Sequence, residues 1–353
     1  MAREQRKLDH IQYALELGDG PCSNGLADVH FVHNCLPELA PADIDITTTL
    51  GGIKLSVPFL VNAITGGTDN VTVINRKLAQ TAASIGAAIA VGSQYGAVKA
   101  KSNYQSFDVV RETYPEGVIF ANVSALATPA EAQEAVKMLA ANALQIHLNP
   151  AQELVMPEGD RNFQGLFNNM RRILETVQVP VIVKETGCGI AAEQFQQLLA
   201  AGFTWFDIGG SGGTNFPEIE ARRTDVATTI LAGWGLPTAY SLIEGNSVCS
   251  ANNILVASGG IRDGLAAAQA FALGTDLVGM AGNVLRCVME SGVEAAQQNL
   301  TEIINDLRLV LLLTGSRNLQ ALRKRPVYFT GALREFLLCR GYDIVKLGAN
   351  RTR

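Results

Sequence analysis

The sequence has little charge and few aromatic residues. Charged residues make up 17% of the 353 residues and aromatic residues 6%, and the formal net charge is −5 with a pI near 5.5. A nucleic-acid-binding surface needs clustered lysine and arginine, and the sequence has no basic stripe. We therefore expect no nucleic-acid partner.

Long hydrophobic runs and paired cysteines are also missing. The mean hydropathy is +0.16, but no apolar run reaches the roughly 18 residues that a membrane-spanning helix requires. The first stretch, MAREQRKLDHIQ, is charged and lacks the apolar region of a secretory signal. The six cysteines are scattered and never form CxxC, which predicts reduced thiols. These features predict a cytoplasmic protein with no membrane partner.

What the chain does contain is a repeat of short apolar runs, each followed by an Ala-rich amphipathic segment. Most runs lie roughly 25–35 residues apart, which is the length of a βα unit. The runs occupy residues 58–67, 87–94, 118–125, 143–149, 179–187, 205–213, 254–260 and 276–283. Eight such units predict an α/β fold, a (β/α)8 TIM barrel. A doubly wound sheet is the alternative, but no single switch point stands out.

We expect a single domain with additions at both ends. Residues 1–57 form an N-terminal extension, with a helix at 3–17 and a Gly51-Gly52 hairpin at 44–55 that plugs the bottom of the barrel. Residues 58–290 form the barrel, and residues 291–353 form C-terminal helices. The long interval 212–253 predicts an extended loop with one or two helices, which is a candidate lid.

The most informative stretch is NALQIHLNPAQE at residues 142–153. It begins as a buried strand and then changes abruptly to His147, Asn149, Gln152 and Glu153. Burying such groups without partners costs roughly 1–3 kcal/mol each, which favours a wet functional cleft over an ordinary polar turn. The active sites of TIM barrels lie at the carboxyl ends of the strands, and every run here changes character at that end.

Two turns of small residues predict a phosphate site. Gly259-Gly260 follows the seventh run, Ala281-Gly282 follows the eighth, and a helix is expected after each turn. Glycines let backbone N–H groups approach a phosphate, and the amino terminus of a helix adds a favourable dipole. Loops after strands seven and eight are where TIM barrels commonly bind phosphate. The sequence therefore predicts a phosphate-bearing ligand.

Lys184 ends the fifth run, in VIVKETG. A lysine at the end of a buried strand is costly unless it meets an anion. It is a candidate for the Schiff-base lysine of an aldolase-like enzyme, or for a cation that stabilises a reduced cofactor ring. Cys188 follows closely but has no histidine near it in the sequence, so we expect an inert thiol.

Three further groups of polar residues are candidates for binding. RKLDH at residues 6–10 is a cluster of cations that suits a diphosphate, although its spacing alone favours a solvated basic face. Glu153 and Asp160 suit Mg²⁺ held together with a substrate phosphate. His30 and His33 have no third ligand at a suitable spacing, so we expect structural or surface histidines. Small uncharged groups that suit a flat heteroaromatic ring follow several runs: Thr65-Gly66-Gly67-Thr68, Ser93-Gln94, Asn122 and Thr214-Asn215.

Taken in order, these motifs resemble type 2 isopentenyl diphosphate isomerase, an FMN-dependent family, over nearly the whole chain. The matching segments are RKLDH (6–10), ITGGT (64–68), VGSQ (91–94), ANVSA (121–125), HLNPAQE (147–153), MPEGDR (156–161), VIVKETG (181–187), GGSGGTNF (209–216) and SGGIR (258–262). RKxDH together with HLNxxQE is specific, whereas the phosphate turns are shared with many FMN barrels. Ile64 departs from the family, in which methionine is usual before TGG.

The resemblance implies interconversion of isopentenyl and dimethylallyl diphosphate, in isoprenoid biosynthesis, by protonation and deprotonation. It implies reduced FMN, Mg²⁺ for the diphosphate, NAD(P)H as the usual reductant, and a homotetramer or homo-octamer. The cofactor contacts that it implies are Thr65, Gly66, Gly67, Ser93, Asn122, Lys184, Ser211, Thr214, Gly259, Gly260, Ala281 and Gly282. The substrate contacts that it implies are Arg6, Lys7, His10, Asn149 and Gln152. It makes Gln152, His147 and Lys184 the catalytic residues and Glu153 the magnesium ligand.

Other functions are weighed against this one. A hydroxyacid oxidase or dihydroorotate dehydrogenase type of FMN oxidoreductase is the main alternative, but an oxidase of that kind needs a late histidine, and all four histidines lie at or before His147. An IMP dehydrogenase-like enzyme that uses Cys188 would carry its cysteine loop after a different strand. A silent flavin- or phosphate-binding protein would not need His147, Gln152, Glu153 and Lys184 together.

Overall fold

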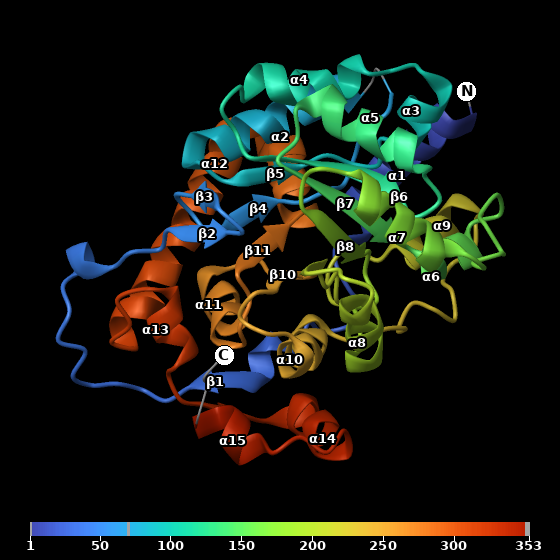
Figure 1. The fold of residues 1–353 in the computed structure, drawn as a ribbon. Coiled ribbons are helices and arrows are strands. Elements are labelled where there is room, and N and C mark those ends of the chain that lie inside the picture. Colours follow the sequence, from blue (N-terminus) through green and yellow to red (C-terminus); the bar gives the residue numbers. More distant parts are fainter. Residues whose placement is uncertain (1, 69–70, 350–353) are drawn as a thin grey trace.

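A closed barrel of eight parallel strands forms the centre of the computed structural model, which describes residues 2–68 and 71–349 and, within them, the side chains from Lys7 onward (Figure 1). Its strands are β4 (Phe59–Val61), β5 (Ala88–Ala90), β6 (Ile119–Ser124), β7 (Ala143–Leu148), β8 (Val181–Glu185), β9 (Trp205–Asp207), β10 (Ile254–Ser258) and β11 (Leu277–Met280). Hydrogen-bonded neighbours follow chain order, and β11 pairs with β4 to close the ring. Each strand lies within one predicted run, so the TIM barrel is confirmed and the doubly wound sheet is excluded.

Helices cover the outside of the barrel. They are α2 (Thr72–Ile85), α3 (Tyr95–Ala100), α4 (Gln105–Thr113), α5 (Pro129–Leu139), α6 (Pro150–Val155), α7 (Leu166–Thr176), α8 (Ala192–Ala200), α9 (Phe216–Arg223), α10 (Thr238–Val248), α11 (Gly264–Ala272) and α12 (Gly282–Leu313). Thr128 caps α5, because its Oγ1 accepts from the Glu131 N–H and Glu131 Oε2 accepts from the Thr128 N–H. Gly292, at φ +90°, divides α12 into two segments. In the part of the chain that the structure describes, no helix combines the length and the apolar character needed to cross a membrane.

The strands bury apolar residues on both faces. Phe59 packs outward against Phe271 of α11, with ring centroids 6.5 Å apart, whereas the next residue, Leu60, points into the barrel. This alternation is the period of two expected for a strand. The interior cluster holds Leu60, Ala88, Ala90, Phe120, Ala143, Ile182, Trp205, Ile254, Val256 and Leu277. The lower barrel is therefore a packed core, and only its carboxyl-terminal end is left for a site.

The predicted hairpin closes the bottom of the barrel. β2 (Thr48–Leu50) and β3 (Ile53–Leu55) pair antiparallel, and Leu50 and Leu55 join the interior cluster. Gly51 adopts a positive φ of 51° in the turn, and a Cβ there would lie 2.6 Å from the Trp205 ring. The hairpin can therefore approach the barrel closely because this residue is glycine.

The ends of the chain form a small sheet that the sequence did not reveal. β1 (Val29–Phe31) pairs antiparallel with β12 (Val327–Phe329), although only helices were expected after residue 291. Three-residue strands are too short to show a period in the sequence. The remaining elements are α1 (Ala2–Leu17), η1 (Leu26–Asp28), η2 (Pro41–Asp43), α13 (Leu319–Arg323), α14 (Gly331–Cys339) and α15 (Ile344–Ala349). In Figure 1, α14 and α15 lie beside β1 at the lower edge of the molecule.

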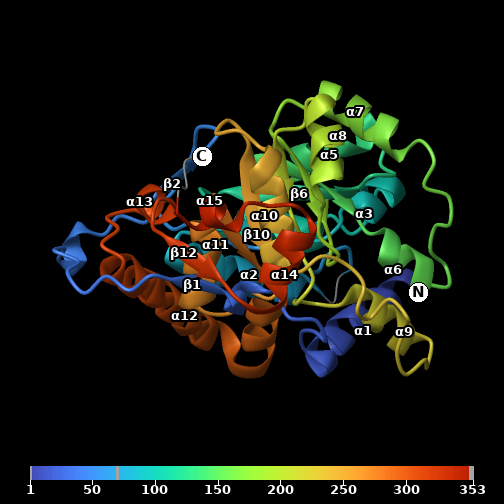
Figure 2. The ribbon, with the colours of Figure 1, turned by 90° about the horizontal axis from the view of Figure 1, so that it is seen from below.

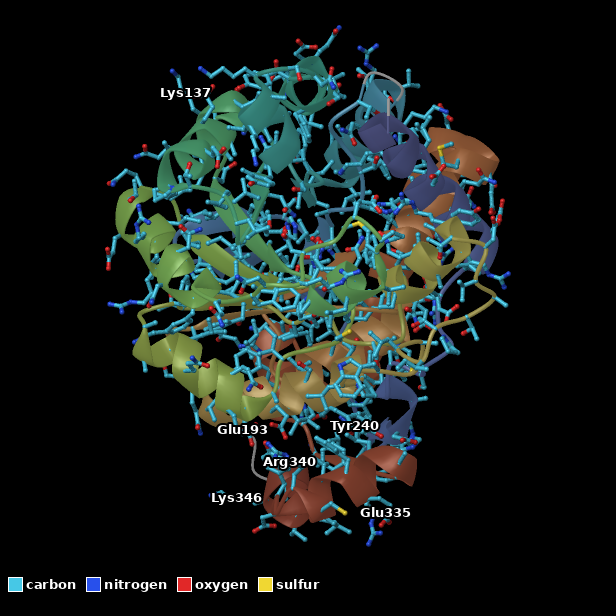
Figure 3. All side chains as sticks on the ribbon, turned by 90° about the vertical axis from the view of Figure 1, so that its right-hand side faces the viewer. Lys137, Glu193, Tyr240, Glu335, Arg340 and Lys346 are labelled. Carbon is cyan, nitrogen blue, oxygen red and sulfur yellow. The ribbon has the colours of Figure 1, made fainter. Side chains whose placement is uncertain are left out.

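Arg340 fastens the C-terminal segment to the barrel helices (Figure 3). Its Nε and Nη2 donate to the two carboxylate oxygens of Glu244 on α10, at 2.8 and 2.9 Å. Nη2 also lies 2.8 Å from Glu193 Oε1 on α8. The Glu244 side chain is fully buried, so its charge depends on this bidentate pair and on the Ala192 N–H at 2.7 Å.

Removing the guanidinium should therefore destabilise the protein. We expect Arg340→Met to lower the free energy of unfolding by about 3 kcal/mol, because the Glu244 carboxylate stays buried without its cation. Urea denaturation measures the change. Arg334→Met is the matched control, since the pair of Arg334 with Glu335 is exposed on both sides and is worth less than about 0.5 kcal/mol. Equal stability of the two variants would contradict the assignment.

Candidate active site

A cavity of about 310 Å³ opens at the carboxyl ends of the barrel strands. His147 of β7, Lys184 of β8, Ser258 of β10 and Met280 of β11 line it, as the changes at the ends of the predicted runs indicated. Most of the predicted site residues meet on its wall: Lys7, His10, Ser93, Asn122, His147, Asn149, Gln152, Glu153, Lys184, Thr214, Gly259, Gly260, Ala281 and Gly282. A volume of this size suits a bound small molecule.

Some predicted residues lie elsewhere. The Thr65 carbonyl accepts from the Gly92 N–H at 2.9 Å, and Gly66 packs so closely on Phe107 that a Cβ would lie 2.3 Å from the ring. Thr65, Gly66 and Gly67 do not line the cavity, whereas the neighbouring Ala63 and Ile64 do. Ser211 lines a second, much smaller cavity. The side chain of Arg6 lies outside the described residues. Cofactor contacts by Thr65, Gly66, Gly67 and Ser211 stay predictions.

Glu220 of α9, which the sequence reasoning missed, joins three elements at the cavity mouth. Its Oε1 lies 2.7 Å from His10 Nε2 on α1 and accepts from Gln152 Nε2 on α6 at 2.7 Å, while Arg223 donates to Oε2. The helices α1, α9 and α6 lie together in Figure 2. Burial alone would raise the pKa of Glu220, but the hydrogen bonds from His10, Gln152 and Arg223 outweigh it and lower the pKa to about 2. Nothing in PEIEARR (217–223) indicates from the sequence alone which of its acids faces inward.

Lys184 is paired with a second carboxylate that the sequence reasoning missed. Its Nζ lies 2.9 Å from Asp207 Oδ2 on β9, and both side chains are buried. An ammonium group held in this way is a fixed positive charge, which favours the cofactor-stabilising role over a Schiff-base amine. Asp207 ends the sixth strand in WFDIGG, and its position at a strand end was the signal available.

Beyond Lys184 the chain turns around the buried Glu185 carboxylate. Glu185 Oε2 accepts the N–H groups of Gly187 and Cys188, at 2.7 and 2.5 Å. Burial raises the pKa of Glu185 to about 7 against the opposing effect of these hydrogen bonds. Burial, together with the Glu185 charge, also raises the pKa of the Cys188 thiol to about 12. A thiol that is so weakly acidic is a poor nucleophile, which favours the inert reading of Cys188.

The glycine turns form another part of the cavity wall. Gly259, Gly260 and Gly282 line it, and Gly282 is the first residue of α12. The next residue, Asn283, also lines the cavity, and its Nδ2 is buried with no partner among the described residues. An unpaired buried donor beside a helix amino terminus is what a phosphate group would satisfy. The chemistry of this part therefore fits the phosphate of the cofactor that the motifs imply.

Metal ligands are sparse. Within residues 2–68 and 71–349, no three His, Cys, Asp or Glu side chains gather where they could hold a metal ion. Glu153 and Asp160 both line the cavity, and the Glu153 carboxylate accepts from Asn149 Nδ2 and from the Asp160 N–H, each at 2.9 Å. Mg²⁺ in proteins is commonly held by one or two carboxylates together with substrate phosphates, so a single carboxylate here suffices for a substrate-borne ion.

His30 does not line the cavity, and its contacts are with the C-terminal segment. It stacks on Tyr328, with ring centroids 4.8 Å apart, and its Nε2 lies 2.8 Å from Thr330 Oγ1. These contacts fasten β1 to the strand and loop beside it. These contacts agree with the structural role that we expected for His30 from the sequence.

Comparison with known proteins finds a matching family model and similar sequences. The family model for FMN-dependent dehydrogenases matches residues 121–328. An isopentenyl-diphosphate delta-isomerase of Moorella thermoacetica is 45% identical over 337 residues, which cover 96% of each chain. An isopentenyl-diphosphate delta-isomerase of a Geobacillus species is 43% identical over 344 residues, which cover 97% of this chain and 98% of the relative.

Solved structures are similar at much lower identity. A lactate oxidase of Pediococcus acidilactici superimposes with a TM-score of 0.69 at 14% identity and covers 91% of both chains. Mandelate oxidase superimposes with a TM-score of 0.65 at 15% identity, over 92% of this chain and 97% of the oxidase. Identities this low show the shared barrel fold alone.

Glu185 should make stability depend on pH. Because its pKa rises from 4.5 in the unfolded chain to about 7 in the fold, the folded state binds more protons between these values. The contribution of Glu185 to the free energy of unfolding is therefore complete below pH 4.5 and is lost as the pH rises through 7. The loss is on the order of 1–3 kcal/mol. We expect Glu185→Gln to flatten the fall in unfolding free energy between pH 5 and pH 8 in urea titrations. An unchanged slope in the variant would contradict this origin.

Proposed function

The chain belongs to the isopentenyl-diphosphate delta-isomerase family, and we propose that it interconverts isopentenyl and dimethylallyl diphosphate with reduced FMN in isoprenoid biosynthesis. The resemblance seen in the motifs is confirmed by the relatives named above. Those relatives are isomerases at 43% identity or more, whereas the oxidases share only the fold. The isomerase function is therefore favoured over an FMN-dependent oxidoreductase.

The observation that carries the proposal is one cavity whose wall holds two groups of residues suited to anions. The first group, which we call the cofactor end, is the glycine turns and the buried Asn283 Nδ2, which has no partner among the described residues. The second group, which we call the substrate end, is Lys7 and His10, brought to the barrel by α1. A cofactor and a diphosphate substrate, both of which carry phosphate, would account for the two groups, and Lys184 and His147 line the same cavity.

The substrate end is held by hydrogen bonds among the residues that would bind the diphosphate. Glu220 fixes His10 and one end of the Gln152 amide, and Asn149 Nδ2 donates to the other end, Gln152 Oε1, at 3.0 Å. Hydrogen bonds therefore hold both the nitrogen and the oxygen of the Gln152 amide, and the residue lines the cavity. We assign diphosphate binding to Lys7, His10 and Asn149, and a position near the reacting carbons to Gln152.

The cofactor end would hold FMN against Lys184. When bound, reduced FMN would supply the acid–base chemistry. Lys184, fixed by Asp207, would stabilise negative charge on the reduced cofactor. Ser93, Asn122 and Thr214 would offer it uncharged groups, and the glycine turns would hold its phosphate. His147, whose pKa is lowered to about 3 by burial and by the charges of Lys7 and Lys184, contributes a neutral imidazole.

The same reasoning extends to the parts of the function that need other molecules. NAD(P)H is the reductant that we propose for the flavin, and Mg²⁺ bound through Glu153 is the counter-ion of the diphosphate. We also propose a cytoplasmic homotetramer or homo-octamer, as the family resemblance implies.

The deciding experiment is an anaerobic assay with isopentenyl diphosphate, FMN, Mg²⁺ and dithionite. We expect dimethylallyl diphosphate only when the flavin is reduced, because the proposed reaction needs the reduced cofactor although it is redox-neutral overall. An oxidised-flavin sample is the control. A protein that binds and reduces FMN yet forms no product would contradict the isomerase and return the oxidoreductase to consideration.

The role of Glu153 is tested by its amide. Glu153→Gln keeps the shape of the side chain but removes the charge that would bind the ion, so we expect the Mg²⁺ concentration for half-maximal activity to rise roughly tenfold or more. A magnesium titration of isomerase activity measures it, with exposed Glu335→Gln as the control. A titration curve identical to that of the unmodified protein would remove Glu153 from the metal site.

A further inference from the structure

A row of buried amides links Asp207 to His147 across the barrel. Asn62 Nδ2 donates to Asp207 Oδ2 at 2.7 Å, and Gln145 Nε2 donates to Asn62 Oδ1 at 3.0 Å. Asn122 Nδ2 donates to Gln145 Oε1 at 3.0 Å, and Asn122 Oδ1 lies 2.8 Å from His147 Nδ1. The three amides and Asp207 are each at most 3% exposed. Gln145 and Asp207 do not line the cavity, whereas Asn62 and Asn122 do.

The direction of every bond in this row follows from its first member. A carboxylate only accepts, so Asn62 must present its NH₂ group to Asp207 and its oxygen to Gln145. An amide that donates at one end accepts at the other, and the same orientation passes through Gln145 and then through Asn122. The oxygen of Asn122 is left for His147, which must then carry its proton on Nδ1.

Two contacts outside the row fix its starting direction. Asn62 Oδ1 also accepts from the Ala63 N–H at 2.8 Å, and a backbone N–H can only donate. Asp207 is surrounded by donors, because Lys184 Nζ and Ser258 Oγ reach it in addition to Asn62. A reversed Asn62 amide would place two donors together and its oxygen against the carboxylate, at a cost of about 1–3 kcal/mol for each buried group left unsatisfied.

We propose that Asp207, Asn62 and Gln145 are positioning residues that set the tautomer of His147 through this relay of amides. The neutral ring then holds hydrogen on Nδ1 and keeps Nε2 as a lone-pair acceptor. Because the pKa of His147 is far below neutrality, the ring is neutral at physiological pH. Its two forms then differ in which ring nitrogen carries the hydrogen and do not differ in charge. Asp207 thus orients His147 and fixes Lys184 at the same time, so two groups of the cavity share one anchor. The inference depends on the hydrogen-bond network and does not require the proposed substrate.

Gln145→Met interrupts the relay at its middle and leaves the Asp207–Lys184 ion pair in place. It also removes the contact of Gln145 Nε2 with Asp207 Oδ2 at 3.4 Å. Methionine has a similar volume and cannot pass on the orientation, so Asn122 becomes free to turn. In ¹⁵N spectra of histidine-labelled FMN-loaded protein, with the His147 signals assigned by His147→Gln, we expect the Nδ1–H tautomer in the unmodified protein. In Gln145→Met we expect at least a third of the signal to move to the Nε2–H tautomer. Gln269→Met, at a buried amide that bonds Val29 on the far side of α11, should leave the spectrum unchanged.

The rival account is a local one, in which the contact of Asn122 with His147 Nδ1 sets the tautomer without help from the rest of the relay. In that case Gln145→Met would keep the pure Nδ1–H signal, and the relay would be overturned. An Nε2–H signal in the unmodified protein would overturn it without any variant, so a variant that fails to fold does not leave the proposal untested.

A rescue separates orientation from general damage to the barrel. In Gln145→Met/Asn122→Asp, a carboxylate that can only accept faces His147 and needs no relay, so we expect the Nδ1–H tautomer to return. In the isomerase assay we expect Gln145→Met to lower kcat about tenfold with little change in KM, because the diphosphate contacts are untouched. If the double variant keeps the mixed tautomers, orientation by amide direction is refuted, whatever the activity shows.

Discussion

The buried ion pair between Lys184 and Asp207 is the constraint on which the rest of the site depends. Two charges inside a barrel are tolerated only when they meet at close range and when their remaining hydrogen-bonding capacity is used. Their Nζ–Oδ2 distance is 2.9 Å, and Asn62 and Ser258 complete the shell of Asp207. The pair therefore places a fixed positive charge at the cavity and a fixed acceptor deeper in the barrel, from which the orientation of the neighbouring amides follows.

The buried carboxylate of Glu220 likewise holds several side chains in place at the mouth of the cavity. Glu220 draws α1 and α6 onto α9 through His10 and Gln152, and Arg223 balances its charge. The N-terminal helix is thus part of the site although it is not part of the barrel. In the proposed assignment, Glu220 would therefore organise residues that bind the substrate, and Asp207 would organise residues that bind the cofactor.

Much of this could be predicted from the sequence. The eight strands and the hairpin at residues 44–55 were predicted because they depend on local signals, namely apolar runs and a glycine turn. His147, Gln152 and Lys184 were predicted because polar residues at the end of a buried strand are conspicuous. Glu220 was missed because an acid in a helix looks like any other until its partners are known. Asp207 also ends a buried strand, but only the structure shows that it pairs with Lys184. Thr65 and Ser211 do not line the cavity, and their cofactor contacts stay predictions.

The sequence by itself determined the class of fold, the end of the barrel that carries the site and the family to which the chain belongs. These properties follow from periodicity and motifs, which can be recognised from the order of residues along the chain. Only the tertiary structure decided which charges pair, which helix covers the mouth and which way each buried amide points. Those outcomes depend on contacts between residues far apart in the chain, such as His10 with Glu220 and Asn62 with Asp207, and on a buried setting in which each donor must find its one available acceptor.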